Sequence, residues 1–433
     1  MADTASPPVT DAPAPASPMA PSPSATPGPN GRRLRVLVHD YSGHPFQVQL
    51  SRALAGRSHD VLHVHCSSYQ TGKGAVHRRE GDPATLGFEA IDLGRVFNRY
   101  AVHRRVPQEL RYGARFARVA AAYRPDVILS TNDPLFAKAR SAYWCRRSGT
   151  PWVFWLQDIY SVAMSGYVSA RLGPAGRVLG HGFQALERSL LRGADAVVPI
   201  SDHFEPVLET WGVPASRRHV IENWAPLDEL EPGPKDNPWA REHDLHDKTV
   251  FLYAGTLGIK HNPRLLLALG ERFASRPNVA VLVVSEGRGA DWLASALRTS
   301  PLTNVVLLPY QPFDRLPEVF ATADVLLGLL SRDAGTYSVP SKVLSYLCAG
   351  RPVLAAIPEG NPAARTVAGA GAGIVVDCDD EQGFLVGAEK LLADPALRRH
   401  HGHRARAHAE RAFNIDTIAD RFEAILLGAA VRR

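Results

Sequence analysis

The chain has 433 residues, which is too many for one ordinary hydrophobic core and predicts two domains of roughly 200 residues each. Its hydrophobic fraction, 45%, is typical of a soluble globular protein, and no apolar run reaches the about 18 residues that predict a transmembrane helix. The net charge of +6 is modest, and because no nucleic-acid fold signature accompanies it, we expect no nucleic-acid partner.

The N-terminal segment, residues 1–31, is dominated by Ala, Pro, Ser, Thr and Asp. It lacks the basic region and the apolar region of a secretory signal. Because such a composition cannot bury a core, it predicts a disordered tail.

Neither cysteine nor histidine spacing predicts a metal site. The four cysteines are far apart, form no CxxC pair and lie in or beside apolar sequence: Cys66, Cys145, Cys348 and Cys378. Free buried thiols in a cytosolic protein are therefore expected. The histidines are scattered and form no HExxH pair.

From residue 34 onward, short apolar runs alternate with amphipathic stretches. Residues 34–39 predict a buried strand, residues 41–46 a loop that contains Gly43, and residues 47–55 a helix. Further strands are predicted at 59–66, 127–130, 152–156 and 196–200. This alternation is typical of a doubly wound parallel sheet, whose strands end at one crevice. We expect this N-terminal Rossmann-like domain to span residues 32–225.

A basic segment interrupts the first domain. Residues 95–118 carry seven arginines and one acidic residue, with aromatic and apolar side chains between them. Two interpretations stay open: a solvated arginine-rich helix face, or a face that lies on an anionic membrane surface. In the second case Arg104, Arg105 and Arg111 are the expected contacts with the membrane or the acceptor.

A Pro- and Gly-rich stretch ends the first domain and predicts a linker at residues 226–240. A second alternation follows and predicts a C-terminal Rossmann-like domain at residues 241–412. Its strands are expected at 250–253, 279–284, 305–308, 325–329, 352–356 and 373–376. Residues 413–433 predict a helix that packs back on the first domain. The cleft between two such domains is the expected ligand site.

The sequence FLYAGTLGIKHNP, residues 251–263, is a strand, a glycine turn and the start of a helix. Its turn contains Gly255, Thr256 and Gly258, and Lys260 follows. Glycine permits close approach of the backbone, and N–H groups at a helix start favour an anion. With a cation beside them, these features predict a phosphate site.

Two later segments repeat this arrangement. Residues 285–289, SEGRG, place Arg288 between glycines at a strand end, where a guanidinium can clamp a phosphate or simply lie on the surface. Residues 334–354 predict a loop followed by a helix that Gly350 ends. Lys342 in its first turn opposes the helix dipole and is better explained by an anionic ligand or partner than by helix stability.

In order and spacing, GTLGIKHNP, SEGRG, NVVLLPYQPFDRLPEVFATADVLLGLL and VPSKVLSYLCAGRPVLA resemble the donor half of GT-B glycosyltransferases. They are most similar to family 4 of the retaining enzymes, in the subgroup of the L-fucosamine transferases of O-antigen synthesis. HDYSGHPFQVQLSRALAGRSHDV, STNDP, FWLQDIYSVA and SDHFEPVLETWGVPASRRHVIENWAP resemble the same subgroup. The resemblance extends from about residue 34 to the C-terminus.

The resemblance implies roles for particular residues. Lys260 matches the cation that stabilises the donor diphosphate, and Gly43 matches a turn that approaches it from the other domain. His44 and Asp158 match the cleft edge and the acceptor side, although a structural histidine and a helix-capping aspartate are equally good interpretations. The remaining positions match the donor site: Gly255, Thr256, Gly258, Arg288, Tyr310, Gln311, Gly335, Thr336, Tyr337, Ser338, Lys342 and Ser345.

One departure from the family pattern concerns hydroxyl recognition. Family 4 usually carries two glutamates, which contact the donor sugar and the ribose, at the positions held here by Tyr337 and Ser345. An arginine often follows the first glycine of the turn, where this chain has Thr256. Ser345 can still hydrogen-bond to ribose, and Asp333 is the alternative acid.

The resemblance implies a retaining transferase of the hexosyl or N-acetylhexosaminyl type, with no cofactor and no metal. The donor is expected to be a nucleotide sugar, with UDP as the nucleotide, and the acceptor a lipid-linked glycan of polysaccharide synthesis. The resemblance therefore also implies a cytoplasmic protein that is peripheral at the cytoplasmic face of the membrane. A nucleotide-sugar epimerase of the same fold and a non-catalytic nucleotide-sugar-binding protein are the alternatives.

Overall fold

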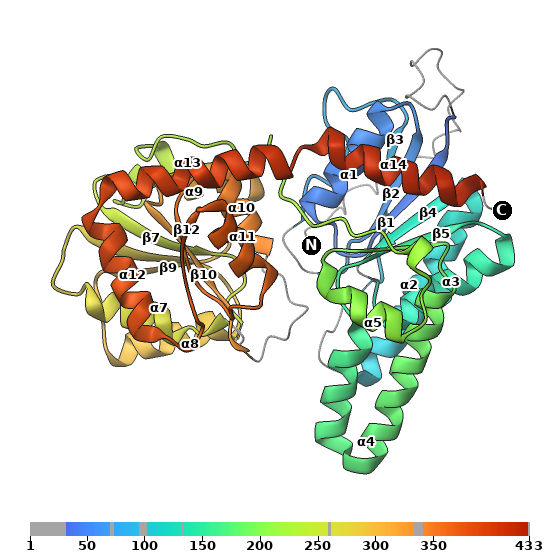
Figure 1. The fold of residues 1–433 in the computed structure, drawn as a ribbon, viewed down its shortest axis with the longest axis horizontal. Coiled ribbons are helices and arrows are strands. Elements are labelled where there is room, and N and C mark those ends of the chain that lie inside the picture. The colour runs from blue at the N-terminus through green and yellow to red at the C-terminus, as the bar shows by residue number, and fades with distance from the viewer. Residues whose placement is uncertain are drawn as a thin grey trace, which may run out of the picture.

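The computed structural model describes residues 32–69, 73–94, 102–131, 133–258, 261–332 and 341–431, without the side chains of residues 102–104. Two lobes lie side by side, each with a parallel sheet between helices, and the last helices run along one side of both lobes (Figure 1). In the described residues, no helix is long and apolar enough to cross a membrane.

The first lobe is built on a six-stranded parallel sheet in the order β3-β2-β1-β4-β5-β6. Apolar runs form its inner strands, since a parallel sheet covered on both faces is buried throughout. The strands are β1 (Arg35–Asp40), β2 (Asp60–Cys66), β3 (Leu86–Ile91), β4 (Val127–Thr131), β5 (Trp152–Leu156) and β6 (Ala196–Pro199). The helices are α1 (Pro45–Gly56), α2 (Val102–Tyr123), α3 (Leu135–Ser148), α4 (Tyr160–Arg192) and α5 (Glu205–Thr210).

The second lobe has the same topology, with strand order β12-β11-β10-β7-β8-β9. Its strands are β7 (Thr249–Ala254), β8 (Val279–Val284), β9 (Val305–Leu308), β10 (Val325–Leu329), β11 (Val353–Ala356) and β12 (Gly373–Val376). Its helices are α6 (Pro238–Glu242), α7 (Arg264–Arg272), α8 (Arg288–Thr299), α9 (Leu316–Thr322), α10 (Ser341–Cys348), α11 (Pro362–Ala370), α12 (Glu381–Ala393) and α13 (Pro395–Ala412). The predicted pair of doubly wound parallel-sheet domains is confirmed.

The last helix, α14 (Ile415–Val431), belongs to the first lobe although it follows the second in the chain (Figure 1). It contacts α1, β4 and β5. The Phe422 ring lies 4.7 Å from the Trp155 ring, and Glu423 accepts hydrogen bonds from Arg57 and His59 at 3.0 Å. These contacts fix the end of the second lobe to the first.

Helix α4 doubles back on itself. Gly173 has φ 53° and ψ −126°, a conformation that favours glycine, and Pro174 follows. The two halves of α4 form a hairpin that projects from the first lobe (Figure 1). Helix was expected after the β5 strand, but the hairpin was not predicted.

A buried ion pair holds the base of this hairpin. Lys138 of α3 donates to Glu187 of α4 at 2.7 Å, and neither side chain is exposed to solvent. The other carboxylate oxygen of Glu187 accepts the backbone N–H of Ser161 at 2.8 Å. One carboxylate therefore joins α3 to both ends of α4.

Substitution of one partner should expose the cost of burying the other. We expect Glu187→Gln to lower the free energy of unfolding by about 3–5 kcal/mol, because the Lys138 ammonium loses its counter-charge in the core. Urea unfolding of the full chain measures this loss. The exposed Glu209→Gln, on α5, is the control and should change stability by less than about 0.5 kcal/mol. An equally small effect of Glu187→Gln would contradict this account of the pair.

Candidate active site

Two glycine turns lie side by side at the carboxyl edge of the second sheet, one after β7 and one after β8. The N–H of Leu257 donates to the Glu286 carbonyl at 3.1 Å, and the N–H of Gly289 donates to the Leu257 carbonyl at 2.8 Å. A Cβ on Gly289 would lie 2.7 Å from that carbonyl oxygen. Gly255 has φ 116°, which a larger residue rarely adopts. Glycine is thus required for the two turns to meet.

Lys342 of α10 reaches the first of these turns. Its Nζ donates to the Thr256 carbonyl at 3.3 Å and to the Tyr253 hydroxyl, and it lies 4.3 Å from the centre of the Tyr253 ring. The structure therefore places the cation that opposes the α10 dipole beside the predicted phosphate turn.

Tyr310 and Gln311, which follow β9, have different surroundings. The Tyr310 hydroxyl lies 2.5 Å from Thr256 Oγ1, and the Tyr310 side chain is 41% exposed. The Gln311 side-chain oxygen instead accepts a hydrogen bond from the Trp239 ring N–H at 3.1 Å. Tyr310 is thus part of the turn surface, whereas the Gln311 amide helps to hold α6.

Of the remaining residues predicted to bind the donor, some lie in the described part of the chain and others lie outside it. Arg288 is exposed as the first residue of α8, directly after the second glycine turn, and Ser345 is half-buried in α10. Gly258 is half-buried in the first turn, and its N–H donates to the His261 ring at 2.9 Å. Outside the described residues lie Lys260, Asp333, Gly335, Thr336, Tyr337 and Ser338.

A buried carboxylate supports the opposing turn in the first lobe. Asp40 ends β1, and its side chain accepts backbone N–H groups from Ser42, at 3.0 Å, and from Gly43 and His44. The sequence prediction of Gly43 did not include Asp40. An aspartate at the end of an apolar strand, just before a glycine loop, was the available signal, because Asp commonly hydrogen-bonds to backbone N–H groups nearby.

Burial raises the pKa of Asp40 to about 7, even though its three backbone hydrogen bonds act in the opposite direction. His63 Nε2 lies 3.8 Å from the carboxylate, and burial lowers the pKa of His63 to about 3. Burial also lowers the pKa of the neighbouring His65 to about 4. The histidines on β2 therefore stay neutral while Asp40 titrates near pH 7.

His44 and Asp158 occupy loops at the carboxyl edge of the first sheet. The half-buried His44 precedes α1, and its ring stacks on Phe46 with centroids 5.7 Å apart. Asp158 is exposed in the loop between β5 and α4. Their positions are compatible with both the functional and the structural interpretation, so their catalytic roles stay predictions.

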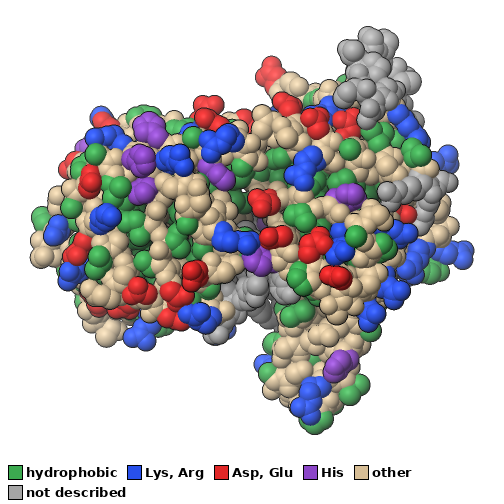
Figure 2. Space-filling model, viewed as in Figure 1, with side chains coloured by type: hydrophobic (Ala, Val, Ile, Leu, Met, Phe, Trp, Pro, Cys, Tyr) green, Lys and Arg blue, Asp and Glu red, His purple; other side chains and the backbone are tan. Residues whose placement is uncertain are grey.

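The carboxyl edges of the two sheets face each other. Asp202, in the segment after β6, accepts a hydrogen bond at 3.1 Å from Arg365 of α11, which follows β11. Figure 2 shows the surface hollowed between the lobes on the face viewed. The turns after β1 and β7 belong to these facing edges.

The basic segment fits the membrane prediction only in part. Arg111 is exposed, and the side chain of Arg104 lies outside the described residues. Arg105, however, donates to the fully buried Glu109 at 2.5 Å, and Glu109 accepts the N–H of Phe136 at the start of α3. Arg105 is better explained as the counter-charge of a buried carboxylate than as a membrane contact.

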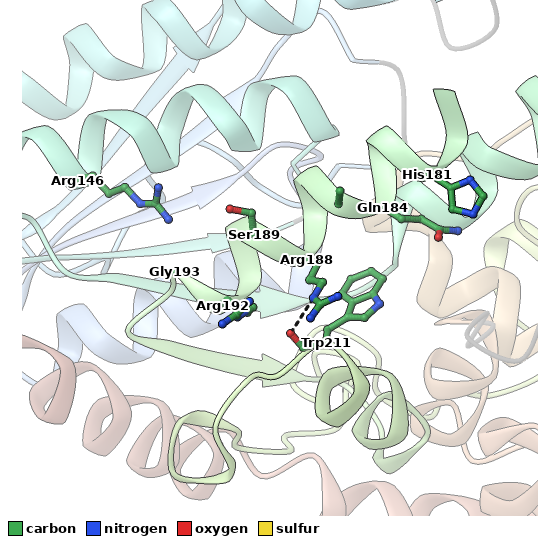
Figure 3. Close-up of a pocket in the computed structure, with 9 residues that line it drawn as sticks. Arg146, His181, Gln184, Arg188, Ser189, Arg192, Gly193 and Trp211 are labelled. Carbon is green, nitrogen blue, oxygen red and sulfur yellow. Dashed lines mark hydrogen bonds between the residues drawn. The ribbon is translucent and has the colours of Figure 1, made fainter. Parts of the chain in front are cut away.

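A separate basic pocket of about 750 Å³ lies along the second half of α4, and it contains no predicted site residue. Three arginines line it, Arg146 from α3 and Arg188 and Arg192 from α4, together with Trp211 (Figure 3). Arg188 donates to the Trp211 carbonyl at 3.3 Å. This pocket is distinct from the two glycine turns.

Among the described residues, one trio brings possible metal ligands together: Asp377, Cys378 and Asp379. Arg332 already pairs with both carboxylates, at 2.7 and 2.8 Å. These contacts explain the trio as an ion-pair cluster.

Comparison with known families identifies both halves of the chain. Residues 43–224 match the family model described as Glycosyl transferase 4-like domain, and residues 236–408 match that described as Glycosyl transferases group 1. The chain belongs to the family 4 glycosyltransferases of the GT-B fold. The two matches coincide with the two lobes, so the glycine turns and Lys342 lie in the group 1 half.

The chain is similar to the putative colanic acid biosynthesis glycosyl transferase WcaI of Escherichia coli K12, with 25% identity over 69% of this chain and 73% of WcaI. In fold it resembles sucrose-phosphate synthase from Thermosynechococcus elongatus, with 17% identity, a TM-score of 0.69, and 93% of this chain and 100% of that chain covered. It also resembles HepE from Anabaena in complex with UDP and glucose, with 16% identity, a TM-score of 0.68, and 92% and 100% covered.

The buried Asp40 predicts a pH dependence of stability. Because its pKa is raised in the folded state, its contribution is fully present below about pH 4 and is lost as the pH rises through about 7. Between about pH 5 and pH 8, we expect wild type to lose roughly 2–4 kcal/mol more stability than Asp40→Asn. Urea unfolding at both pH values measures the difference. The exposed Asp314→Asn should behave as wild type, and the same slope in Asp40→Asn would contradict the prediction.

Proposed function

We propose that this glycosyltransferase moves a hexosyl or N-acetylhexosaminyl group from a UDP-sugar to a hydroxyl of a lipid-linked glycan, with retention of configuration. The observation that carries the proposal is the position of Lys342 beside the paired glycine turns. A cation, a glycine-rich backbone and the start of α8 converge there, and this combination suits a diphosphate.

The chemical difficulty of the reaction is the departure of the nucleoside diphosphate while positive charge develops on the sugar ring. Groups that stabilise the diphosphate therefore accelerate the reaction more than groups that bind the whole donor equally in both states. Lys342 supplies one charge at the turn, Lys260 supplies another in the adjoining sequence, and Arg288 lies at the neighbouring turn. The exposed Tyr310 ring beside Thr256 offers a surface for the base.

Two features support a direct contribution from the first lobe. The Asp40 carboxylate accepts backbone N–H groups of its Gly43 turn. Its Asp158 loop lies between β5 and α4, and Glu187 holds the start of α4 by accepting the Ser161 N–H. Such supported loops can hold an acceptor hydroxyl close to the sugar. We propose that the leaving phosphate itself accepts the proton of this hydroxyl, so that neither His44 nor Asp158 has to act as a strong base.

The choice of donor and acceptor rests on similarity. HepE is known in complex with UDP and glucose, and WcaI is named for colanic acid synthesis. We extend UDP and a polysaccharide role to this chain as proposals, and we propose that it belongs to the L-fucosamine transferase subgroup. Tyr337 and Ser345 stand where family 4 usually has acids. We therefore expect a donor whose hydroxyl pattern differs from that of the common hexoses.

Incubation of the donor without acceptor separates the alternatives. An epimerase would convert the donor sugar in the absence of acceptor, whereas a transferase would only hydrolyse it slowly. A non-catalytic binding protein would do neither. Thermal-shift screening against a panel of nucleotide sugars identifies the donor, and nuclear magnetic resonance of the product then reports its anomeric configuration. An inverted product would refute retention.

Removal of a diphosphate cation should impair the chemical step. We expect Lys260→Ala to lower the turnover rate by about 10²–10³-fold, the loss typical for one such stabilising group. Steady-state assays with the donor found by screening measure this change. Lys390→Ala, at an exposed position of α12, is the control and should keep full turnover. Near-normal turnover of Lys260→Ala would refute its assignment.

A further inference from the structure

The projecting hairpin of α4 has an unusual surface for a water-exposed arm. Of the eleven large hydrophobic side chains that are exposed in the described residues, five lie on α4: Val162, Tyr167, Leu172, Val178 and Leu179. Leu172 is 56% exposed and Val178 is 75% exposed, and both flank the Gly173 turn at the tip. Exposed apolar groups concentrated on one projecting element mark a contact surface.

The packing of the hairpin explains why these side chains point outward. Where the two halves of α4 meet, small residues form the seam: a Cβ on Gly176 would lie 2.1 Å from the Val168 carbonyl oxygen, and one on Gly180 would lie 2.1 Å from Ser165 Oγ. At these two positions the halves pack too closely for any side chain larger than that of glycine. The larger apolar side chains near the tip remain on the outside.

The exposed charges of α4 are all positive. Arg171 and Arg177 flank the tip, and Arg188 and Arg192 follow nearer the base, where they line the pocket of Figure 3. The only acidic residue of α4 is Glu187, which is buried against Lys138. The lower end of the projection in Figure 2 shows hydrophobic, basic and histidine side chains but no acidic ones.

The base of the hairpin is anchored, so the tip is held away from the body. The Lys138–Glu187 pair and the Glu187–Ser161 hydrogen bond fix both ends of α4. Its first half, residues 160–172, is about 20 Å long at 1.5 Å per residue. A surface in contact with the tip would therefore be kept at a defined distance from the loop that contains Asp158.

We propose that the α4 hairpin is a membrane-docking element whose apolar, arginine-flanked tip inserts into the headgroup region of an anionic lipid bilayer. Apolar side chains that enter the interface and cations that remain among anionic headgroups are the usual combination for such docking. A second copy of the tip fits less well, because it would bring four arginines together without an acid. This inference rests on the proposed function only in that both place the acceptor at a membrane. Membrane docking and glycosyl transfer can each be refuted without refuting the other.

Vesicle binding of the full chain tests this proposal. Wild type should co-sediment with vesicles of phosphatidylcholine and phosphatidylglycerol and bind weakly to phosphatidylcholine alone. The triple variant Leu172→Ser, Val178→Ser, Leu179→Ser should reduce binding by about tenfold or more, because the apolar contact is lost. Arg171→Glu with Arg177→Glu should remove the preference for the anionic lipid.

Controls separate docking from folding and from catalysis. Val386→Ser removes an apolar side chain that is 50% exposed on α12 of the other lobe, and it should bind vesicles as wild type does. Donor hydrolysis without acceptor should be unchanged in every variant, since the tip is remote from the glycine turns. Vesicle binding by the tip variants equal to that of wild type, or no binding by wild type, would overturn the proposal. So would a loss of self-association in the tip variants without a loss of vesicle binding.

Discussion

The hydrogen bond between the N–H of Gly289 and the carbonyl of Leu257 is the contact on which the proposed site depends. It joins the turns after β7 and β8. The two turns lie so close that a Cβ at position 289 would collide with the Leu257 carbonyl oxygen, so only glycine fits there. Lys342 then reaches the joined turns from α10, after β10. Parallel strands make this convergence possible, because they deliver successive loops to the same edge of a sheet. The turns after β7 and β8 and the Lys342 side chain of α10 thus meet at one place.

The first lobe is organised by buried carboxylates rather than by close glycine contacts. Asp40 holds the Gly43 turn, Glu109 holds the start of α3, and Glu187 holds the start of α4. Each accepts backbone N–H groups that would otherwise be unsatisfied near a strand end. A buried charge lowers stability unless it is compensated, and Arg105 and Lys138 compensate the charges of Glu109 and Glu187. The loops at the carboxyl edge of the first sheet are therefore held by buried carboxylates, and burying these groups lowers the stability of the fold.

Much of the fold could be predicted from the sequence, since most strands are short apolar runs with definite ends. β3 was missed because it is half-exposed and carries Glu89, so no apolar run marks it. Gly173 and Pro174 mark the turn of α4. The hairpin was nevertheless missed, because local sequence does not show that the two halves of the helix pack against each other.

Most donor-side residues were predicted from the resemblance to GT-B glycosyltransferases, and Lys342 was also predicted from its conflict with the helix dipole. The buried polar pairs could not be predicted from the sequence. Asp40 and His63 lie on neighbouring strands, and Lys138 and Glu187 on two different helices, so each pair meets only in the tertiary fold. Arg105 shows the same limit: its exposure depends on Glu109, one helical turn away and fully buried. Local sequence shows that a residue is charged, but not whether its side chain faces the solvent or the core.

The position of a bound nucleoside diphosphate tests the central claim most directly. A crystal structure of the full chain with UDP should show its β-phosphate within hydrogen-bond distance of the 255–258 backbone, with the Lys342 side chain beside it. Density for the diphosphate only in the arginine-lined pocket between α3 and α4, with the glycine turns empty, would contradict the assignment of the donor site.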